Sequence, residues 1–156
     1  MTNDTFSTLD NTIIRAAQKI SLPLARFAIF VVFFWFGILK VIGTSPANPL
    51  VQGLMEKTIP FMTFGQFIVF FGIYEMIIGI VFLFPKLVRL AIALLVPHMI
   101  TTVLPLILLP AVAWQGFLIP TLEGQYIVKN IVIIALALAI ASHLEPVKAT
   151  TKNSHA

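Results

Sequence analysis

The sequence contains no cysteine. Disulfide bonds, thiolate metal sites and Cys-X-X-Cys redox relays are therefore excluded, and with them the membrane thiol oxidases that also use small four-helix bundles. Charge is scarce as well: 10% of the 156 residues are charged, whereas soluble domains have about 25%. The ten Lys and Arg residues stand singly rather than in a basic run, so we expect no nucleic-acid partner.

Hydrophobic residues are abundant, at 59% of the chain. They gather in four stretches long enough to cross a bilayer, whose hydrocarbon core of about 30 Å needs about 20 helical residues. We therefore predict an all-α integral membrane protein, a four-transmembrane-helix bundle with a short N-terminal amphipathic helix, embedded in the lipid bilayer. The predicted spans are about 22–42, 64–84, 90–114 and 125–142.

The predicted bundle, residues 22–143, lies between a leader of residues 1–21 and a tail of residues 144–156. Apolar residues recur in the leader at helical spacing, which predicts a short helix over 8–21 on the cytoplasmic membrane surface. Pro23 is expected to end this helix, because proline cannot donate its hydrogen bond. A disordered leader is the alternative.

The cations favour one side of the membrane. Lys and Arg occur before the first span, between the second and third, and after the fourth, at Arg15, Lys19, Lys86, Arg89, Lys148 and Lys152. The long connection 43–63 has only Lys57, which Glu56 offsets, and 111–124 has neither Lys nor Arg. The positive-inside rule then predicts cytoplasmic termini and places both long connections outside.

Glu75 is the only charged residue in the second predicted span. At about 1.5 Å rise per residue it lies on the order of 16 Å in from Phe64, near the bilayer midplane. It shares a helical stripe with Gly72 and Gly79, a pattern typical of a surface where helices approach closely. An acid at this depth is costly unless paired, which makes Glu75 a candidate functional residue. The alternative is an ion pair that only stabilises the bundle.

The expected depth of each cation in the membrane indicates which of them can pair with Glu75. Lys40 and Lys129 both lie in the outer half of their spans, although either could instead reach the headgroups with its long side chain. We predict a buried polar cluster of Glu75, Lys129 and Lys40, with Asn130 and Tyr126 alongside and His98 below. Arg26 is a further candidate at the inner end of the first span.

A carboxylate, an imidazole and a phenol together can relay protons or hold a quinone-like carbonyl. The alternative is that His98 is a single structural histidine whose hydrogen bonds are made within a polar patch. No second intramembrane histidine is available for haem, and one His with one Glu is an incomplete metal site, so we expect no metal and no intrinsic cofactor. The aromatic run 33–36 is similar to a quinone site, but such runs usually pack in the core or face lipid.

Three segments resemble the DoxX family of small bacterial membrane proteins. They are Arg26 with the later run Phe34–Lys40, the glycine–acid–glycine segment Gly72–Gly79, and Pro120–Asn130, which opens the last span. The resemblance covers about residues 26–143. It implies a four-helix protein of the bacterial inner membrane, with Arg26, Lys40, Glu75, Lys129 and Asn130 at the shared polar positions, and it assigns those residues no role.

The resemblance implies a membrane subunit of a redox or oxidative-stress-response system. Such a subunit could interact with quinone, and we expect catalysis only together with a redox partner subunit, since the chain shows no fused soluble catalytic domain. A homo-oligomer is a further expectation. The alternatives are a non-catalytic scaffold or assembly factor, and a small-solute or proton-coupled transporter, which the absence of visible internal repeats disfavours.

Overall fold

Four helical segments of the protein are long and apolar enough to cross a membrane. The computed structural model describes residues 2–146, and side chains from Phe6 onward; residues 147–156, which include most of the predicted tail with Lys148 and Lys152, lie outside the described part. Within it the spans are Phe6–Val41, Phe64–Phe82, Pro85–Leu108 and Leu122–Ala141. The predicted fold class, an all-α four-helix membrane bundle, is confirmed.

The elements follow one another with short connections. The order is α1 (Thr2–Val41), α2 (Asn48–Thr58), α3 (Phe64–Phe82), the 3-10 turn η1 (Pro85–Leu87), α4 (Val88–Val103), α5 (Pro105–Leu108), α6 (Pro110–Ala113), β1 (Trp114–Gly116), β2 (Ile119–Pro120), α7 (Leu122–Val128) and α8 (Asn130–Ala141). We call the end where η1 joins α3 to α4 the turn end. The opposite end, which carries α2 and the β1–β2 hairpin, is the loop end.

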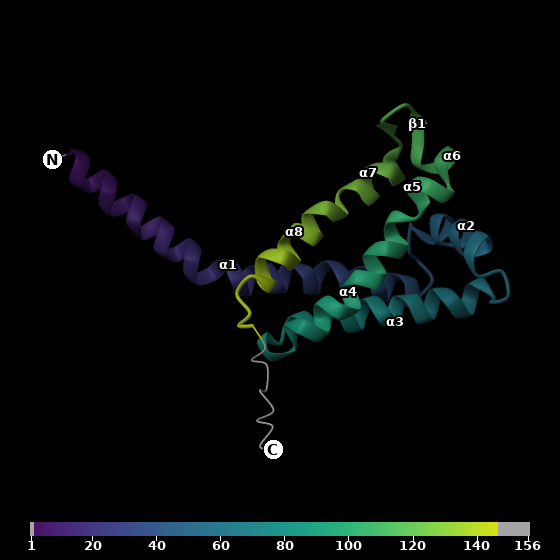
Figure 1. The fold of residues 1–156 in the computed structure, drawn as a ribbon, viewed down its shortest axis with the longest axis horizontal. Helices are drawn as coiled ribbons and strands as arrows, with labels where there is room; N and C mark the ends of the chain where they lie inside the picture. The colour runs from purple at the N-terminus through teal and green to yellow at the C-terminus, as the bar shows by residue number, and fades with distance from the viewer. Residues whose placement is uncertain (1, 147–156) are drawn as a thin grey trace, which may run out of the picture.

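Figure 1 shows how the spans are arranged. The second half of α1 runs alongside α3, and these two helices form the most extensive contact in the bundle. The third and fourth spans lie across this pair, with α4 packed against α8. The N-terminal part of α1 projects away from the other helices, and its side chains from Phe6 to Ser21 are exposed.

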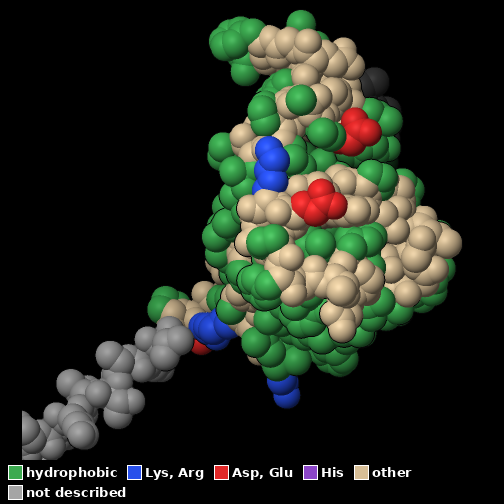
Figure 2. All heavy atoms as spheres, turned by 90° about the vertical axis from the view of Figure 1, so that its right-hand side faces the viewer, with side chains coloured by type: hydrophobic (Ala, Val, Ile, Leu, Met, Phe, Trp, Pro, Cys, Tyr) green, Lys and Arg blue, Asp and Glu red, His purple; other side chains and the backbone are tan. Residues whose placement is uncertain are grey.

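The hydrophobic core lies where the four spans meet, toward the turn end. Its fully buried large side chains are Phe82, Ile29, Ile78, Ile140 and Val88. Many other large hydrophobic side chains stay exposed along the spans. Figure 2 looks onto the loop end, where a few charged side chains lie among hydrophobic ones. The exposed hydrophobic surface of the spans suits lipid rather than water, which agrees with the length and composition of the helices.

The first helix differs from the prediction. Pro23 does not end a leader helix: α1 continues without interruption from Thr2 to Val41. Proline inside a helix removes one hydrogen bond and commonly kinks the helix instead of ending it, and Figure 1 shows α1 changing direction partway along. The alternative of a disordered leader is also wrong for the described residues, whereas contact of the leader with a membrane surface stays a prediction.

The third span begins and ends earlier than predicted, and it starts at Pro85 rather than near 90. Its helix ends at Leu108, not near Trp114, because Leu109 precedes Pro110 and leaves the helical region at φ −126° and ψ 54°. The residue before a proline is disfavoured in the α region, so the chain turns there. The short antiparallel pair β1–β2 follows, which the sequence analysis did not predict.

The fourth span begins earlier than predicted, at Leu122 rather than near 125. Thr121 caps α7 by accepting a hydrogen bond from the Gly124 amide at 3.1 Å. Gly124 itself packs directly against the carbonyl oxygen of Ala113, where any side chain would collide. This close approach joins the start of the fourth span to the end of α6.

Candidate functional site

The α1–α3 interface positions Glu75. The residues of α3 that are buried lie on one stripe: Ile68, Gly72, Glu75, Ile78, Gly79 and Phe82. Glu75 therefore faces the interior of the bundle, as its helical spacing predicts, and only 5% of its surface is exposed.

Glycines set the distance between the two helices. A Cβ placed on Gly37 of α1 would lie 2.5 Å from the carbonyl oxygen of Gly72, and one on Gly72 would lie 2.6 Å from that of Gly37. Each glycine thus leaves room for the backbone of the other, which is the usual role of small residues between membrane helices. This close packing brings the side chain of Lys40, one turn beyond Gly37, level with the acid on α3.

Lys40 is the cationic partner of Glu75. Its Nζ lies 2.6 Å from Glu75 Oε2, and both side chains are almost completely buried. A second contact, at 3.5 Å, joins Lys40 Nζ to the carbonyl oxygen of Phe36 on the same helix. The alternative in which Lys40 reaches the headgroups is therefore wrong.

His98 of α4 contacts the other carboxylate oxygen. Its Nε2 lies 3.0 Å from Glu75 Oε1, and its Nδ1 lies 3.3 Å from the hydroxyl oxygen of Thr102. That hydroxyl is also placed to donate to the His98 carbonyl oxygen at 2.8 Å, and the Thr101 hydroxyl donates to the same carbonyl at 2.7 Å. Glu75 on α3 therefore contacts α1 through Lys40 and α4 through His98.

Aromatic rings enclose the imidazole. Phe71 stacks on His98 with ring centroids 5.1 Å apart and an interplanar angle of 9°, while Phe33 meets the ring edge-on at the same distance. The Lys40 Nζ also lies 5.7 Å from the centroid of Phe71. Cations are attracted to aromatic faces, so Phe71 stabilises positive charge on either partner of Glu75. We refer to Glu75, Lys40, His98 and Thr102, with these rings, as the Glu75 cluster.

Sequence reasoning missed Phe71, Phe33 and Thr102 as parts of this site. Phe71 stands one helical turn before Glu75, and Thr102 one turn after His98, so the spacing of three to four residues that places side chains on one helix face could have found both. Phe33 was placed in an aromatic run and on the helical stripe of Arg26 and Lys40, but not beside His98. Of that run, Phe33 contacts His98, whereas Trp35 is 62% exposed.

Lys129 and Tyr126 do not belong to the cluster, contrary to the prediction. Lys129 is exposed, and its Nζ lies 4.7 Å from the ring centroid of Tyr126, which is itself 58% exposed. The reason is rotational: α7 buries Gly124 and Ile127, and two residues beyond Ile127 the helix has turned roughly half way round. The predicted Glu75–Lys129 pair is absent from the ion pairs of residues 6–146.

Asn130 and Arg26 also stand apart from Glu75. Asn130 is half-buried, and no hydrogen bond among the described residues joins it to the cluster. Arg26 is half-buried too and precedes Lys40 by fourteen positions, which corresponds to roughly 21 Å along α1. Of the seven predicted residues, the structure brings together Glu75, Lys40 and His98.

The hydrogen bonds of the cluster are compatible with two protonation states. In one, His98 is protonated on both nitrogens and donates to Glu75 and to Thr102. In the other, it keeps the proton on Nε2 and the Thr102 hydroxyl turns to donate to Nδ1, while Thr101 still satisfies the His98 carbonyl. The heavy-atom positions of the cluster therefore suit either form of the imidazole, and the two forms differ in the direction of the Thr102 hydroxyl.

The fold and the site together define a multi-pass membrane protein with a buried carboxylate–lysine–histidine cluster. Comparison with protein-family models, with curated proteins and with solved structures finds no match. The resemblance to the DoxX family therefore stays a prediction. Among side chains 6–146 there is no group of three His, Asp or Glu residues that could hold a metal ion.

Proposed function

We propose that this protein is a DoxX-like membrane subunit of a redox or oxidative-stress-response system, in which the Glu75 cluster exchanges protons within the membrane. The observation that carries the proposal is the pair of protonation states that the contacts of His98 allow. The resemblance of the three sequence segments supplies the redox context. A buried acid beside a histidine is a typical proton-handling arrangement in membrane proteins.

The chemistry we propose is proton supply to a quinone. Reduction of a quinone to a quinol takes up two electrons and two protons; the electrons would come from a partner subunit, and the cluster would deliver protons from His98 and then be reprotonated. The stacked ring of Phe71 supports the charged form of the imidazole during this exchange. In this proposal the chain alone is not an oxidoreductase.

The test compares wild type with Glu75→Gln, a change that keeps the shape of the side chain. Both are purified in nanodiscs and examined by mass spectrometry for bound quinone and proteins, after circular dichroism has shown that each is folded. We expect Glu75→Gln to lose quinone or its redox partner. Glu56→Gln is the matched control, because Glu56 is exposed and bonds only to Gln52. Equal recovery from folded wild type and Glu75→Gln contradicts the proposal.

A second candidate function, a non-catalytic scaffold, is favoured by a different observation. Both oxygens of Glu75 are already occupied by residues of the same chain, one by Lys40 and one by His98. A carboxylate whose two oxygens are both bonded within the chain suits a structural contact that holds helices together. This candidate expects Glu75→Gln to reduce thermal stability, with partner recovery falling only in proportion to folded protein.

We further propose that the protein lies in the bacterial inner membrane with the turn end in the cytoplasm. Lys86 and Arg89 at the turn end support this orientation, since cytoplasmic connections are enriched in such residues. Because the chain has no cysteine, single replacements Ser142→Cys and Gln115→Cys can be labelled selectively. A membrane-impermeant maleimide added to intact cells should label position 115 and not 142; the opposite pattern would reverse the orientation.

A further inference from the structure

Arg26 is half-buried, and its Nε has no hydrogen-bond partner among the described residues. That atom is inaccessible to solvent, and no other hydrogen bond or ion pair to Arg26 is formed within the described residues. It lies on α1 one turn before Ile29, which is buried in the hydrophobic core. A charged group in such a position is costly unless another charge or several acceptors face it.

The packing of α1 against α3 fixes the depth of Arg26. The two helices are antiparallel, since Gly72 faces Lys40 whereas Gly79 faces Phe30. Four residues further back along α1, Arg26 is therefore level with about residue 83, just beyond the end of α3. Arg26 thus lies at the turn end, at the boundary between the apolar spans and the polar layer of a bilayer.

The acids whose side chains the structure describes do not neutralise Arg26. Glu75 is occupied by Lys40 and His98 in the middle of the bundle. Asp10 lies sixteen positions earlier on α1, which is roughly 24 Å away along the helix. Glu145 is at the turn end but is exposed and takes part in neither ion pair of the described residues, although its backbone oxygen accepts a hydrogen bond from Arg89.

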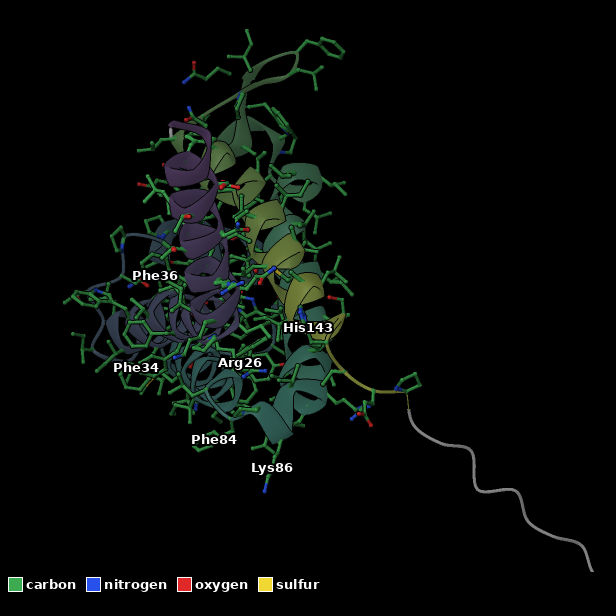
Figure 3. The ribbon with its side chains drawn as sticks, turned by 90° about the vertical axis from the view of Figure 1, so that its left-hand side faces the viewer. Arg26, Phe34, Phe36, Phe84, Lys86 and His143 are labelled. Atoms are coloured by element: carbon green, nitrogen blue, oxygen red, sulfur yellow. The ribbon has the colours of Figure 1, made fainter. Side chains whose placement is uncertain are left out.

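Two further nitrogen-bearing side chains belong to the turn end. Lys86 lies in η1 and His143 just after the end of α8, and Figure 3 shows the Lys86 side chain pointing away from the helices. The His143 Nδ1 donates to the Ala139 carbonyl oxygen at 2.9 Å, so in the neutral ring Nε2 is an acceptor and offers no donor to an anion. The turn end therefore combines a sheltered guanidinium with two further nitrogen-bearing side chains that lack an acidic partner among the described residues.

We propose that Arg26 forms a binding site for the phosphate group of an anionic phospholipid in the leaflet at the turn end. A guanidinium presents several N–H groups in a plane and binds phosphate through two parallel hydrogen bonds, which a lysine cannot do. Basic pockets between membrane helices are known to take anionic lipid headgroups. The lipid supplies the missing counter-charge to Arg26, and its acyl chains lie along the exposed apolar surface of the spans.

The experiment measures phosphatidylglycerol binding to the full chain in detergent. Native mass spectrometry titrates wild type, Arg26→Gln and Arg26→Lys with phosphatidylglycerol, and phosphatidylcholine measures background. Loss of a charge-assisted pair should weaken binding by about tenfold in Arg26→Gln, with Arg26→Lys between the two. Arg15→Gln, which removes the same charge from the exposed part of α1, should bind like wild type.

Equal phosphatidylglycerol affinity of Arg26→Gln and wild type would overturn the proposal, since the arginine would then only extend to the headgroups without a specific site. Displacement of the lipid by inorganic phosphate at equal concentration would show that the site takes free phosphate, which overturns the lipid as ligand. If Arg26→Gln does not fold, Arg26→Lys decides: it must bind more weakly than wild type for the proposal to stand.

Discussion

Two lysines occupy comparable depths in this protein and have different fates. Lys40 lies on α1, which packs against α3 through glycines, and it forms a buried ion pair with Glu75. Lys129 joins α7 to α8, faces away from the bundle and lies over an exposed tyrosine. The difference shows that helix rotation and the closeness of packing, rather than depth in the membrane, decide which cation neutralises a buried acid.

The largest expected effect compares the two lysines directly. Lys40→Met leaves the Glu75 carboxylate buried without its cation and should cost about 3–5 kcal/mol of unfolding free energy. Lys129→Met removes an exposed charge and one cation–π contact, and should cost about 1 kcal/mol or less. Thermal unfolding in detergent, followed by circular dichroism, measures both.

A double mutant tests whether Lys129, rather than Lys40, is the partner of Glu75. If Lys129 were the partner of Glu75, exchanging the charges in Glu75→Lys with Lys129→Glu would restore stability. We expect no rescue, because Lys129 is exposed and forms no ion pair among the described residues. Recovery of wild-type stability would contradict the ion pair with Lys40.

The next effect concerns the glycines that bring Lys40 to the acid. Gly72→Ala places a Cβ 2.6 Å from the carbonyl oxygen of Gly37, so the helices must separate. We expect a loss of about 1–3 kcal/mol, typical of overpacking, by the same unfolding measurement. Gly65→Ala is the control on the same helix, since a Cβ there meets no atom within 4 Å. Equal changes in both variants would contradict a close-packing role for Gly72, since helix propensity alone favours alanine at both positions.

A smaller effect is expected at the hydroxyl that contacts His98. Thr102→Val keeps the shape but removes the hydrogen-bond partner of Nδ1, and should cost about 1 kcal/mol. Thr58→Val is the control, because its hydroxyl bonds only to the Leu54 carbonyl oxygen in the exposed helix α2. Infrared difference spectra of His98 should change in Thr102→Val alone; an unchanged spectrum would remove Thr102 from the Glu75 cluster.

The smallest effect lies in the hairpin, far from the cluster. Leu118 has φ 56°, a left-handed conformation in which a leucine is strained by about 1–2 kcal/mol. Leu118→Gly relieves this strain but gives the unfolded chain more freedom, so we expect a change of about 1 kcal/mol or less. A loss well above this in thermal unfolding would mean that the exposed leucine side chain makes a stabilising contact with the surrounding lipid or detergent.

Much of the site was open to prediction because membrane burial constrains polar residues strongly. A lone carboxylate in an apolar span has to face protein, and its helical spacing with glycines indicated the face correctly. His98 followed from depth and from its place on the next helix. The prediction that Lys129 pairs with Glu75 was wrong because depth in the membrane gives no information on which way a helix is rotated. The one-residue break between α7 and α8 changes that rotation further.

The sequence by itself determined that the chain is a membrane bundle of four spans, since only runs of apolar residues about 20 long satisfy a bilayer. It also determined that Glu75 faces inward. The tertiary structure decided which cation pairs with Glu75, where the third span ends, and that the Arg26 Nε has no partner among residues 6–146. These outcomes depend on contacts between distant segments, such as Gly37 with Gly72, and such contacts exist only once the helices have packed.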